Sequence, residues 1–377
     1  VHVVGAGVMG GDIAAWCALR GLEVTLQDRE QQHIDPALQR AARLFSKKVR
    51  DANERATVSD RLVADVEGQG VADADLLIEA IFENAEAKQA LYAKLQKSMK
   101  PDALLATNTS SIRLEDLRTV VEQPLRFVGL HFFNPVAQLP LVEVVRCQDT
   151  EQAALDQAFA FVKAIGKVPL ECMSSPGFVV NRILAPYMAE AMYLAEAGVP
   201  LPVIDKAAED FGMPMGPIEL IDSVGLDVAL HVSDVLSKAF DRDAPDVLSG
   251  MVEARKLGRK SGQGFYEWQE GKAVKPAAQA HSAVPDLADR LILPMVNEAV
   301  ACLSEGVVSD PDLLDAGVIF GTGFAPFRGG PLQYARDRGV DDVVATLARL
   351  AEEHADSNGQ RFLPHPGWDN LRGSETS

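Results

Sequence analysis

A strand pattern, a glycine-rich turn and a helix pattern follow one another at the start of this chain, and their order constrains the fold more than any other feature. The apolar run 1–4 leads into residues 5–10, which have the spacing G-x-G-x-x-G, and helical periodicity continues to about Gly21. A second strand pattern over 23–27 ends at Asp28. Between a strand and a helix, with an acid after the next strand, such a motif is a strong signal. The sequence therefore predicts a dinucleotide-binding unit of Rossmann type.

Each residue type in the turn has a physical reason. Gly5 permits the tight turn, Gly7 lets the backbone approach a pyrophosphate, and Gly10 allows close packing of helix against strand. Val8 and Met9 lie in the first helical turn, where unpaired N–H groups and the positive end of the helix dipole attract phosphates. We therefore expect all five residues to contact the cofactor. A glycine-rich turn that binds no ligand is the alternative.

Asp28 indicates which dinucleotide binds. A carboxylate at the end of the second strand accepts hydrogen bonds from the adenosine ribose hydroxyls, and it repels a 2′-phosphate. This favours NAD over NADP, although the positive charge of Arg29 weakens the preference.

Strands and helices continue to alternate through the first half of the chain. We expect helices over 37–49, 52–63, 85–99 and 151–165, and strands over 75–80, 104–107 and near 168–170. Such alternation is typical of a parallel, doubly wound α/β sheet, whose ligands bind outside the carboxyl ends of the strands. Glu83, Ser110 and His131 each lie at or just after the end of a predicted strand. We expect these side chains on the same edge as the glycine-rich turn.

A predicted hairpin places His131 opposite a carboxylate. An apolar run leads to His131, the chain turns through a loop with two prolines, and a second apolar run carries Glu143. If Phe133 pairs with Leu141 in an antiparallel hairpin, His131 lies directly opposite Glu143, with about 5 Å between the Cβ atoms. A carboxylate that holds one ring nitrogen leaves the other to accept a proton, as in many enzymes. The alternative is a half-buried histidine with no catalytic role.

Composition and charge exclude several classes of protein. The net charge of −18 argues against nonspecific nucleic-acid binding, which needs a basic surface. No apolar run is long enough to span a membrane. The four cysteines are widely separated, and no histidine has a partner at the spacing of a metal site. We therefore expect buried thiols, no disulfide framework and no metal.

The second half of the chain has a helical pattern and contains an internal repeat. At one constant offset, Arg182, Pro186, Glu190 and Gly198 recur as Arg290, Pro294, Glu298 and Gly306. At a slightly larger offset, Gly216, Pro217, Gly225 and Asp227 recur as Gly330, Pro331, Gly339 and Asp341. We predict a Rossmann-type domain over 1–174 and two related all-α domains over 175–271 and 285–371, with a polar linker from Gly271 to Pro285.

Six sequence blocks, in order along the chain, resemble the L-3-hydroxyacyl-CoA dehydrogenase family. They are Gly5–Gly10, Glu83 with Lys88, Asn108–Ser111, His131–Pro135, Ser175–Arg182 and Gly258–Gly262. The blocks HFFNP and PGFVVNR are the most specific of these. The duplicated helical region resembles the dehydrogenase part of the multifunctional fatty-acid-oxidation enzymes, whose alpha subunit combines a hydratase with a dehydrogenase.

The resemblance implies an activity and a set of residue roles. The reaction would be the NAD-dependent oxidation of (S)-3-hydroxyacyl-CoA to 3-ketoacyl-CoA in fatty-acid β-oxidation. His131 would be the general base, and Glu143 would orient its ring and stabilise the imidazolium. Ser110 and Asn181 would hydrogen-bond the reacting oxygen or the thioester region.

The resemblance also implies contacts with the cofactor and with CoA. The positions that match cofactor contacts in the family are Glu83, Lys88, Ser110, Asn134 and Lys260, and Asn134 would position the cofactor or brace the histidine. Lys47 and Lys48 are candidates for binding the CoA phosphates. For these two lysines a solvated helix face is the alternative.

The relatives of this type imply partners as well as an acyl-CoA substrate. A hydratase domain would precede the dehydrogenase in the parent protein, a thiolase would associate with it, and the location would be cytoplasmic, with an organellar one still open. We expect a monomer, because the second helical copy can cover the face through which shorter relatives dimerise. Two other functions remain: a different NAD-dependent 3-hydroxyacid dehydrogenase, and a non-catalytic protein that binds NAD or acyl-CoA.

Overall fold

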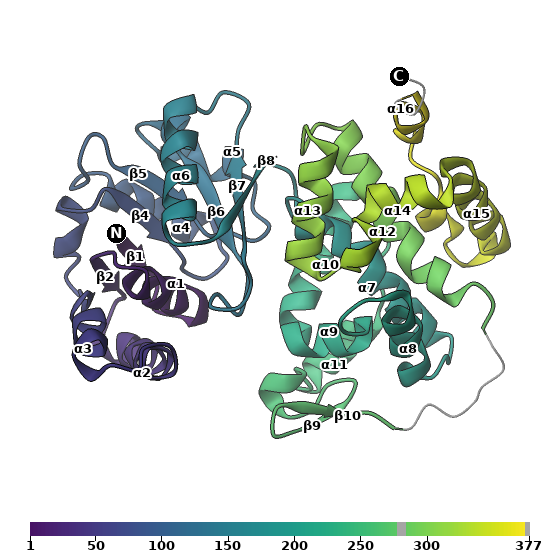
Figure 1. Cartoon of the computed structure of the whole chain (residues 1–377), viewed down its shortest axis with the longest axis horizontal. Helices are drawn as coiled ribbons and strands as arrows, with labels where there is room; N and C mark the ends of the chain where they lie inside the picture. The colour runs from purple at the N-terminus through teal and green to yellow at the C-terminus, as the bar shows by residue number, and fades with distance from the viewer. Residues whose placement is uncertain (277–283, 374–377) are drawn as a thin grey trace. The chain divides into compact units, whose positions relative to one another are not determined.

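The computed structural model describes residues 1–276 and 284–373, which form two compact units (Figure 1). The first unit ends at Phe178 and the second begins at Val179. This boundary lies close to the predicted start of the helical region. Both predicted helical domains fall within the second unit, so their status as separate domains stays a prediction.

An eight-stranded sheet forms the centre of the first unit, in the order β3-β2-β1-β4-β5-β6-β7-β8. Its strands are β1 His2–Val4, β2 Val24–Gln27, β3 Leu62–Ala64, β4 Leu76–Glu79, β5 Leu104–Thr107, β6 Val128–Phe132, β7 Leu141–Arg146 and β8 Val168–Met173. The strands from β3 to β6 in this order run parallel, β7 is antiparallel to β6, and β8 is parallel to β7. This confirms the predicted Rossmann-type α/β fold.

Helices cover the two faces of this sheet (Figure 1). They are α1 Val8–Leu19, α2 Gln31–Lys48, α3 Ala52–Asp60, α4 Ala85–Leu95, α5 Leu114–Leu117 and α6 Gln152–Ala164. Val3, Leu26 and Ile78 lie in one core with residues of α1, α2 and α6. Because successive side chains of a strand point to opposite faces, Leu77 between its neighbours is buried on the other side.

Three predicted helix boundaries in the first unit are wrong. The helix expected over 37–49 begins at Gln31 and contains Pro36, whose missing N–H leaves one backbone carbonyl of the first turn without its helical partner. The helix expected over 52–63 ends at Asp60, since Leu62 is buried in β3 and pairs with Val24 of β2. The helix expected over 85–99 ends at Leu95, where the chain enters turns.

The second unit is almost entirely helical, as predicted. Its helices are α7 Val180–Glu196, α8 Leu201–Phe211, α9 Pro217–Val224, α10 Leu226–Phe240, α11 Val247–Glu253, α12 Leu287–Ser304, α13 Pro311–Thr322, α14 Pro331–Arg338, α15 Val340–Glu353 and α16 Trp368–Gly373. Within residues 1–276 and 284–373, no helix has the length and apolar character needed to cross a bilayer. All four cysteines are reduced and buried.

The internal repeat has a counterpart in the contacts of the second unit. Asp205, near the middle of α8, accepts a hydrogen bond from Ile218 N in α9 at 2.8 Å. Asp315 of α13 does the same for Leu332 N in α14, at 2.7 Å. In each copy, an aspartate on one helix thus binds a backbone N–H at the start of the next helix, just after the Gly-Pro pair that recurs in the sequence.

The predicted linker from Gly271 to Pro285 is wrong in its first part. Residues Lys272–Val274 form β10, which pairs antiparallel with β9 Glu267–Gln269. Glu270 and Gly271 both have positive φ, of 50° and 78°, which suits the tight turn of a two-residue hairpin. The rest of the predicted linker includes 277–283, which lies outside the described residues.

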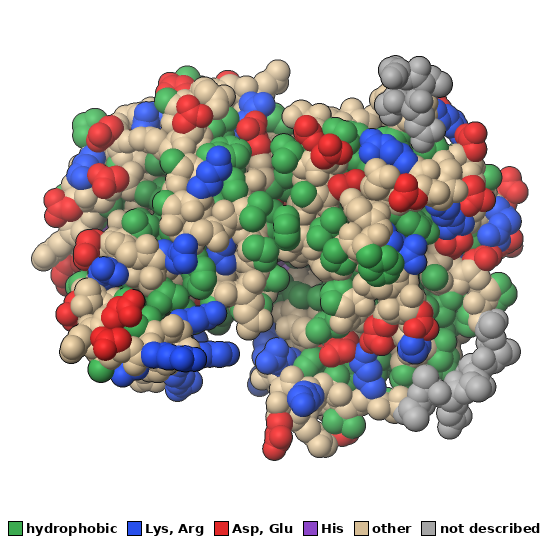
Figure 2. Space-filling model, viewed as in Figure 1, with side chains coloured by type: hydrophobic (Ala, Val, Ile, Leu, Met, Phe, Trp, Pro, Cys, Tyr) green, Lys and Arg blue, Asp and Glu red, His purple; other side chains and the backbone are tan. Residues whose placement is uncertain are grey.

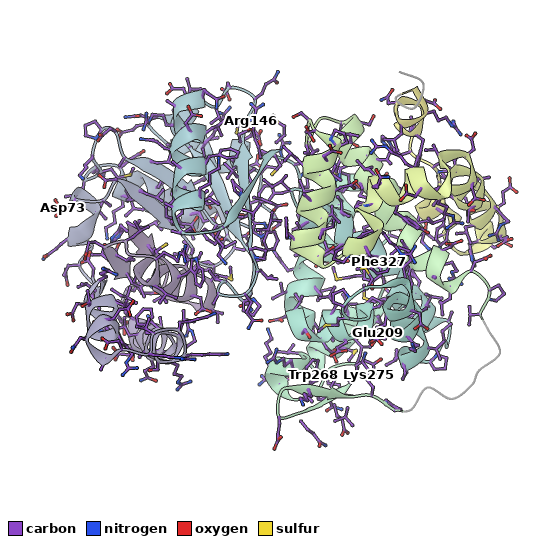
Figure 3. The ribbon with its side chains drawn as sticks, in the orientation of Figure 1. Asp73, Arg146, Glu209, Trp268, Lys275 and Phe327 are labelled. Carbon is purple, nitrogen blue, oxygen red and sulfur yellow. The ribbon has the colours of Figure 1, made fainter. Side chains whose placement is uncertain are left out.

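Lys275 anchors the end of this hairpin to two helices (Figure 3). Its Nζ lies 2.8 Å from a carboxylate oxygen of Glu209, 2.7 Å from Glu219 and 3.1 Å from Asp205. Trp268 donates its indole N–H to Asp222 at 3.0 Å. These contacts fix a segment whose composition had indicated a linker.

Candidate active site

The glycine-rich turn has the geometry that its sequence predicts. Gly5 has φ +104°, and a Cβ there would lie 2.5 Å from the carbonyl oxygen of Ala80. A Cβ on Gly10 would lie 1.8 Å from the carbonyl oxygen of Gly5, so only glycine lets the helix pack this closely. At Gly7 nothing lies within 4 Å of the corresponding point. The turn therefore packs tightly against the protein at Gly5 and Gly10, and it leaves free space beside Gly7.

Side chains from neighbouring elements brace this turn. Asp28, directly after β2, accepts a hydrogen bond from Ala6 N at 2.8 Å. Arg40 of α2 donates to the carbonyl oxygen of Gly7 at 2.8 Å and to Asp12 of α1 at 3.1 Å. Asp28 thus lies beside the turn, where the sequence places it. Val8 begins α1 and is 54% exposed, and Met9 follows it.

Glu83 organises the loop that follows β5. Its Oε1 atom accepts hydrogen bonds from Thr109 Oγ1 at 2.6 Å, from Ser110 N at 2.8 Å and from Ser111 N at 3.1 Å. The Ser110 hydroxyl lies 3.3 Å from the same oxygen. The structure therefore brings together Glu83 and Ser110, which the sequence placed at two different strand ends.

Lys88 supports Glu83 from inside the protein. The Lys88 side chain is almost fully buried, and its Nζ lies 2.6 Å from Glu79 Oε1 and 3.3 Å from Glu83 Oε2. Burial opposes ionisation of Glu83, but the Lys88 ammonium and the donors of the 109–111 loop outweigh it and lower the pKa of the Glu83 carboxyl. Glu83 is therefore a stable carboxylate at neutral pH. A direct contact of Lys88 with the cofactor stays a prediction.

His131 lies directly opposite Glu143 in the β6–β7 pair, which confirms the predicted register. The ring Nδ1 atom lies 2.6 Å from Glu143 Oε2. Glu143 is fully buried and His131 is 5% exposed. The rings of Phe133 and Phe178 lie 4.5 and 5.6 Å from the imidazole, centroid to centroid. A short, buried His–Glu bond flanked by aromatic rings is a geometry suited to moving a proton at the other ring nitrogen.

Asn108 is a site residue to which the sequence assigned no role. Its Oδ1 atom accepts a hydrogen bond from Phe132 N at 2.9 Å, and its own N–H binds the carbonyl oxygen of Glu79 at 2.7 Å. It thus ties the strand end that carries His131 to its neighbours. The signal for it was its place directly after β5. Asn134, which was expected to position the cofactor or brace His131, is exposed beyond β6.

The remaining predicted site residues lie in the second unit or at the end of α2. Asn181 is in the first turn of α7. Lys260, in the short 3₁₀ helix Arg259–Ser261, is bound to the carboxylate of Asp227. Asp289, which stands in the second copy where the first has Asn181, binds Arg338 at 2.5 Å. That ion pair lies within the second copy and joins α12 to α14.

Lys47 and Lys48 end α2 and are exposed. Figure 2 shows Lys and Arg side chains gathered over this part of the first unit. Lys48 also lines an open groove of about 550 Å³ with Trp16, Arg20 and Arg61. Glu54 also lines this groove, so three basic side chains and one acidic side chain face it.

The fold and these contacts define the class of protein. A Rossmann-type sheet, an open glycine turn with an acid beside it, and a buried His–Glu pair are together the parts of a dinucleotide-dependent dehydrogenase. Residues 1–175 match the family model described as 3-hydroxyacyl-CoA dehydrogenase, NAD binding domain. Residues 177–268 match the one described as 3-hydroxyacyl-CoA dehydrogenase, C-terminal domain.

Individual relatives agree with these matches. The (S)-3-hydroxybutyryl-CoA dehydrogenase of Ralstonia eutropha is 33% identical with TM-score 0.66, over 71% of this chain and 98% of that one. The 3-hydroxybutyryl-CoA dehydrogenase of Escherichia coli K12 is 27% identical with TM-score 0.86, over 100% of this chain and 99% of that one. The chain therefore belongs to the 3-hydroxyacyl-CoA dehydrogenase family.

Longer relatives match as well. The fatty acid oxidation complex subunit alpha of Pseudomonas entomophila is 36% identical over 400 residues, which cover 96% of this chain and 55% of that protein. The chain thus spans about half the length of the curated relatives it matches.

Proposed function

We propose that this protein oxidises the 3-hydroxyl group of (S)-3-hydroxyacyl-CoA to a 3-ketone in fatty-acid β-oxidation, with His131 and Glu143 as the catalytic pair. The observation that carries the proposal is the buried bond between His131 Nδ1 and Glu143, 2.6 Å long. When bound, NAD would accept the hydride that leaves C3 of the substrate. Family membership and the NAD binding domain support the same reaction.

His131 and Glu143 divide the work of proton transfer. Glu143 accepts a hydrogen bond from Nδ1–H, which leaves Nε2 to take the proton of the substrate hydroxyl as the C–H bond breaks. The carboxylate also stabilises the imidazolium that forms. Because Glu143 is fully buried, little water competes for this bond.

Ser110 and Asn181 would hold the substrate oxygen or the thioester against the histidine. Ser110 is supported in this role by the two contacts that fix its backbone and hydroxyl to Glu83. Asn181 is supported by its place in the first turn of α7, directly after the segment that carries Phe178. Both assignments rest on the resemblance to the family.

The residues of the first unit suit a bound NAD. Gly7 offers open space for a pyrophosphate, the first turn of α1 with Val8 and Met9 offers unpaired N–H groups, and Asp28 lies ready for the adenosine ribose. Glu83 matches a cofactor-contacting position of the family, and its Oε1 atom accepts a hydrogen bond from Ser110 N at 2.8 Å. We assign Lys88, Asn134 and Lys260 to the cofactor on the resemblance alone.

Lys47 and Lys48 are proposed to bind the phosphates of CoA. Their exposure at the end of α2, together with the positive groove that Lys48 shares with Arg20 and Arg61, supports this assignment. Charge alone does not set the acyl-chain length that the enzyme prefers.

The parent protein is proposed to be of the alpha-subunit type. Similarity to the alpha subunits of fatty acid oxidation complexes supports an attached hydratase domain, association with a thiolase and a cytoplasmic location. The duplicated helical region supports a monomeric dehydrogenase part. Sedimentation of the chain alone and with a thiolase would test both points, and a tight dimer of the chain alone would contradict the second.

The catalytic proposal is tested by following NADH absorbance with acetoacetyl-CoA. We expect His131→Ala and Glu143→Gln to lower kcat by about 10²–10⁴-fold, the usual contribution of general acid–base catalysis. An active wild type with unchanged turnover in His131→Ala would contradict the mechanism and favour a different dehydrogenase. An inactive wild type that still binds NADH would favour the non-catalytic alternative.

A further inference from the structure

We propose that Glu79 is a positioning residue for the reaction, which fixes Ser110 through Lys88 and Glu83. The inference rests on the proposed function, since Ser110 is placed in the active site there. Glu79 ends β4, and its side chain is fully buried inside the first unit.

Glu79 is the centre of a buried hydrogen-bond network. Its carboxylate is fully buried and accepts hydrogen bonds from four donors on three neighbouring segments. Lys88 Nζ and Ile81 N bind Oε1 at 2.6 and 2.8 Å. Tyr92 Oη and Thr107 Oγ1 bind Oε2 at 2.6 and 2.7 Å. Both oxygens of this buried carboxylate therefore have two hydrogen-bond donors each.

The donors make this arrangement specific for a carboxylate. Lys88 and the backbone N–H of Ile81 can only donate hydrogen bonds. Burial and the negative charge of Glu79 raise the pKa of the Tyr92 hydroxyl far above its usual value, so Tyr92 also keeps its proton. The network therefore suits two acceptor oxygens at residue 79, and an amide there requires Tyr92 and Thr107 to turn their hydroxyls.

The charge of Glu79 determines how strongly the Lys88 ammonium attracts the carboxylate of Glu83. The ammonium lies closer to Glu79, at 2.6 Å, than to Glu83 Oε2, at 3.3 Å. If Glu79 loses its charge, Lys88 has Glu83 as its one anionic partner in the network and moves toward it. Glu83 Oε1, which accepts from Ser110 N at 2.8 Å, then shifts with the carboxylate and displaces the loop.

The catalytic rate is therefore expected to depend on how far Ser110 is displaced. A misplacement of about 1 Å at an active site can cost about 10²-fold in rate. Glu79→Gln keeps the size of the side chain, and Tyr92 and Thr107 can rotate their hydroxyls to accept from the new amide. We therefore expect this variant to fold, and its kcat/KM to fall roughly 10- to 100-fold.

A double-mutant cycle distinguishes positioning from a general loss of stability. We would measure kcat/KM with acetoacetyl-CoA and NADH for the wild type, Glu79→Gln, Ser110→Ala and the double variant. If Glu79 acts through Ser110, the Glu79→Gln loss disappears in the Ser110→Ala background. Independent losses, which multiply in the double variant, would overturn the proposal while the proposed function stands. An inactive wild type would instead refute the proposed function.

Glu190→Gln is the matched control. Glu190 is also a buried carboxylate, and it binds Arg290 and Arg361 at 2.6 Å each, but it lies in the helical unit. We expect it to lower the melting temperature without changing kcat/KM at a temperature where the protein is folded. Equal losses of kcat/KM in Glu190→Gln and Glu79→Gln would assign the effect to stability, and the proposal would fail.

Discussion

Arg182 and Glu298 form an almost fully buried ion pair, 2.6 Å long, between the two helical repeats of the second unit. The equivalent residues of the two repeats, Arg290 and Glu190, form the reciprocal pair at 2.6 Å. Each repeat thus supplies the arginine to one pair and the glutamate to the other. The two repeats are therefore joined by matched charges as well as by apolar packing.

Glu298→Ala should destabilise the second unit by about 1–3 kcal/mol, because Arg182 loses its closest partner but keeps Glu305, which lies 2.8 Å from its guanidinium. Calorimetry that resolves the unfolding of this unit would measure the loss. Glu353→Ala, which breaks an exposed pair with Arg349 in the same unit, is the control and should change stability little. Similar losses for the two variants would contradict this account of the repeat interface.

Gly7→Ala should weaken NADH binding without changing stability, and Gly5→Ala should lower the stability of the first unit. Gly7 has a negative φ of −59° and open space around it, so alanine should leave stability unchanged and weaken NADH binding roughly tenfold, about 1.4 kcal/mol. Gly5→Ala should destabilise the first unit by about 1–3 kcal/mol or more, since its φ of +104° strains an alanine and its Cβ meets Ala80. Melting curves and NADH titrations would separate the two effects. Unchanged NADH affinity in Gly7→Ala would place the pyrophosphate elsewhere.

Asp28→Asn should reduce the preference for NADH over NADPH. The amide keeps an oxygen for the hydrogen bond from Ala6 N but removes the charge that repels a 2′-phosphate. The ratio of kcat/KM for the two cofactors is the measurement. Asp28→Ala, which also removes the acceptor for Ala6 N, should in addition lower the melting temperature. An unchanged cofactor ratio in both variants would show that another residue sets the preference.

Asp315 should make the stability of the second unit depend on pH. Burial raises the pKa of this carboxyl from its usual value of 3.8 to about 6, although Leu332 N and Gln333 N stabilise its charged form. Between these two pH values the folded state holds a proton that the unfolded state releases, so stability falls as pH rises from about 4 to about 6. The loss would be about 3 kcal/mol at most.

Asp315→Asn keeps one acceptor for the start of α14 and removes the titration. The difference in free energy of unfolding between wild type and variant should therefore fall between pH 4 and about 6 and be flat above that range. Urea unfolding at several pH values would measure it. A difference that is constant with pH would contradict the raised pKa.

Local patterns were enough to predict the parts of the site that lie in one motif or one hairpin. The turn at Gly5 and the register of His131 opposite Glu143 each follow from a few consecutive residues or from simple pairing. Glu79 could not be predicted in this way. Its partners Tyr92 and Thr107 lie on a helix and another strand, and only the parallel pairing of β4 with β5 and the packing of α4 bring them to it.

Two wrong predictions about the fold, the helix over 52–63 and the linker after Gly271, have the same physical cause. Leu62 follows a helical pattern without a break, and its assignment to β3 depends on pairing with Val24, which is distant in the sequence. The β9–β10 hairpin lies in a polar segment, and its strands are held by side chains such as Lys275 that bind other helices. In both places long-range contacts outweigh the local pattern.

The three hydrogen bonds that Glu83 Oε1 accepts from Thr109, Ser110 and Ser111 have a consequence for ligand affinity. Fixing the backbone of a residue costs roughly 1–2 kcal/mol of conformational entropy. For these three residues that cost is met when the chain folds, since their hydrogen bonds to Glu83 exist before any ligand arrives. Binding then requires little further ordering of the loop, and more of the contact energy at Ser110 is available to hold the ligand.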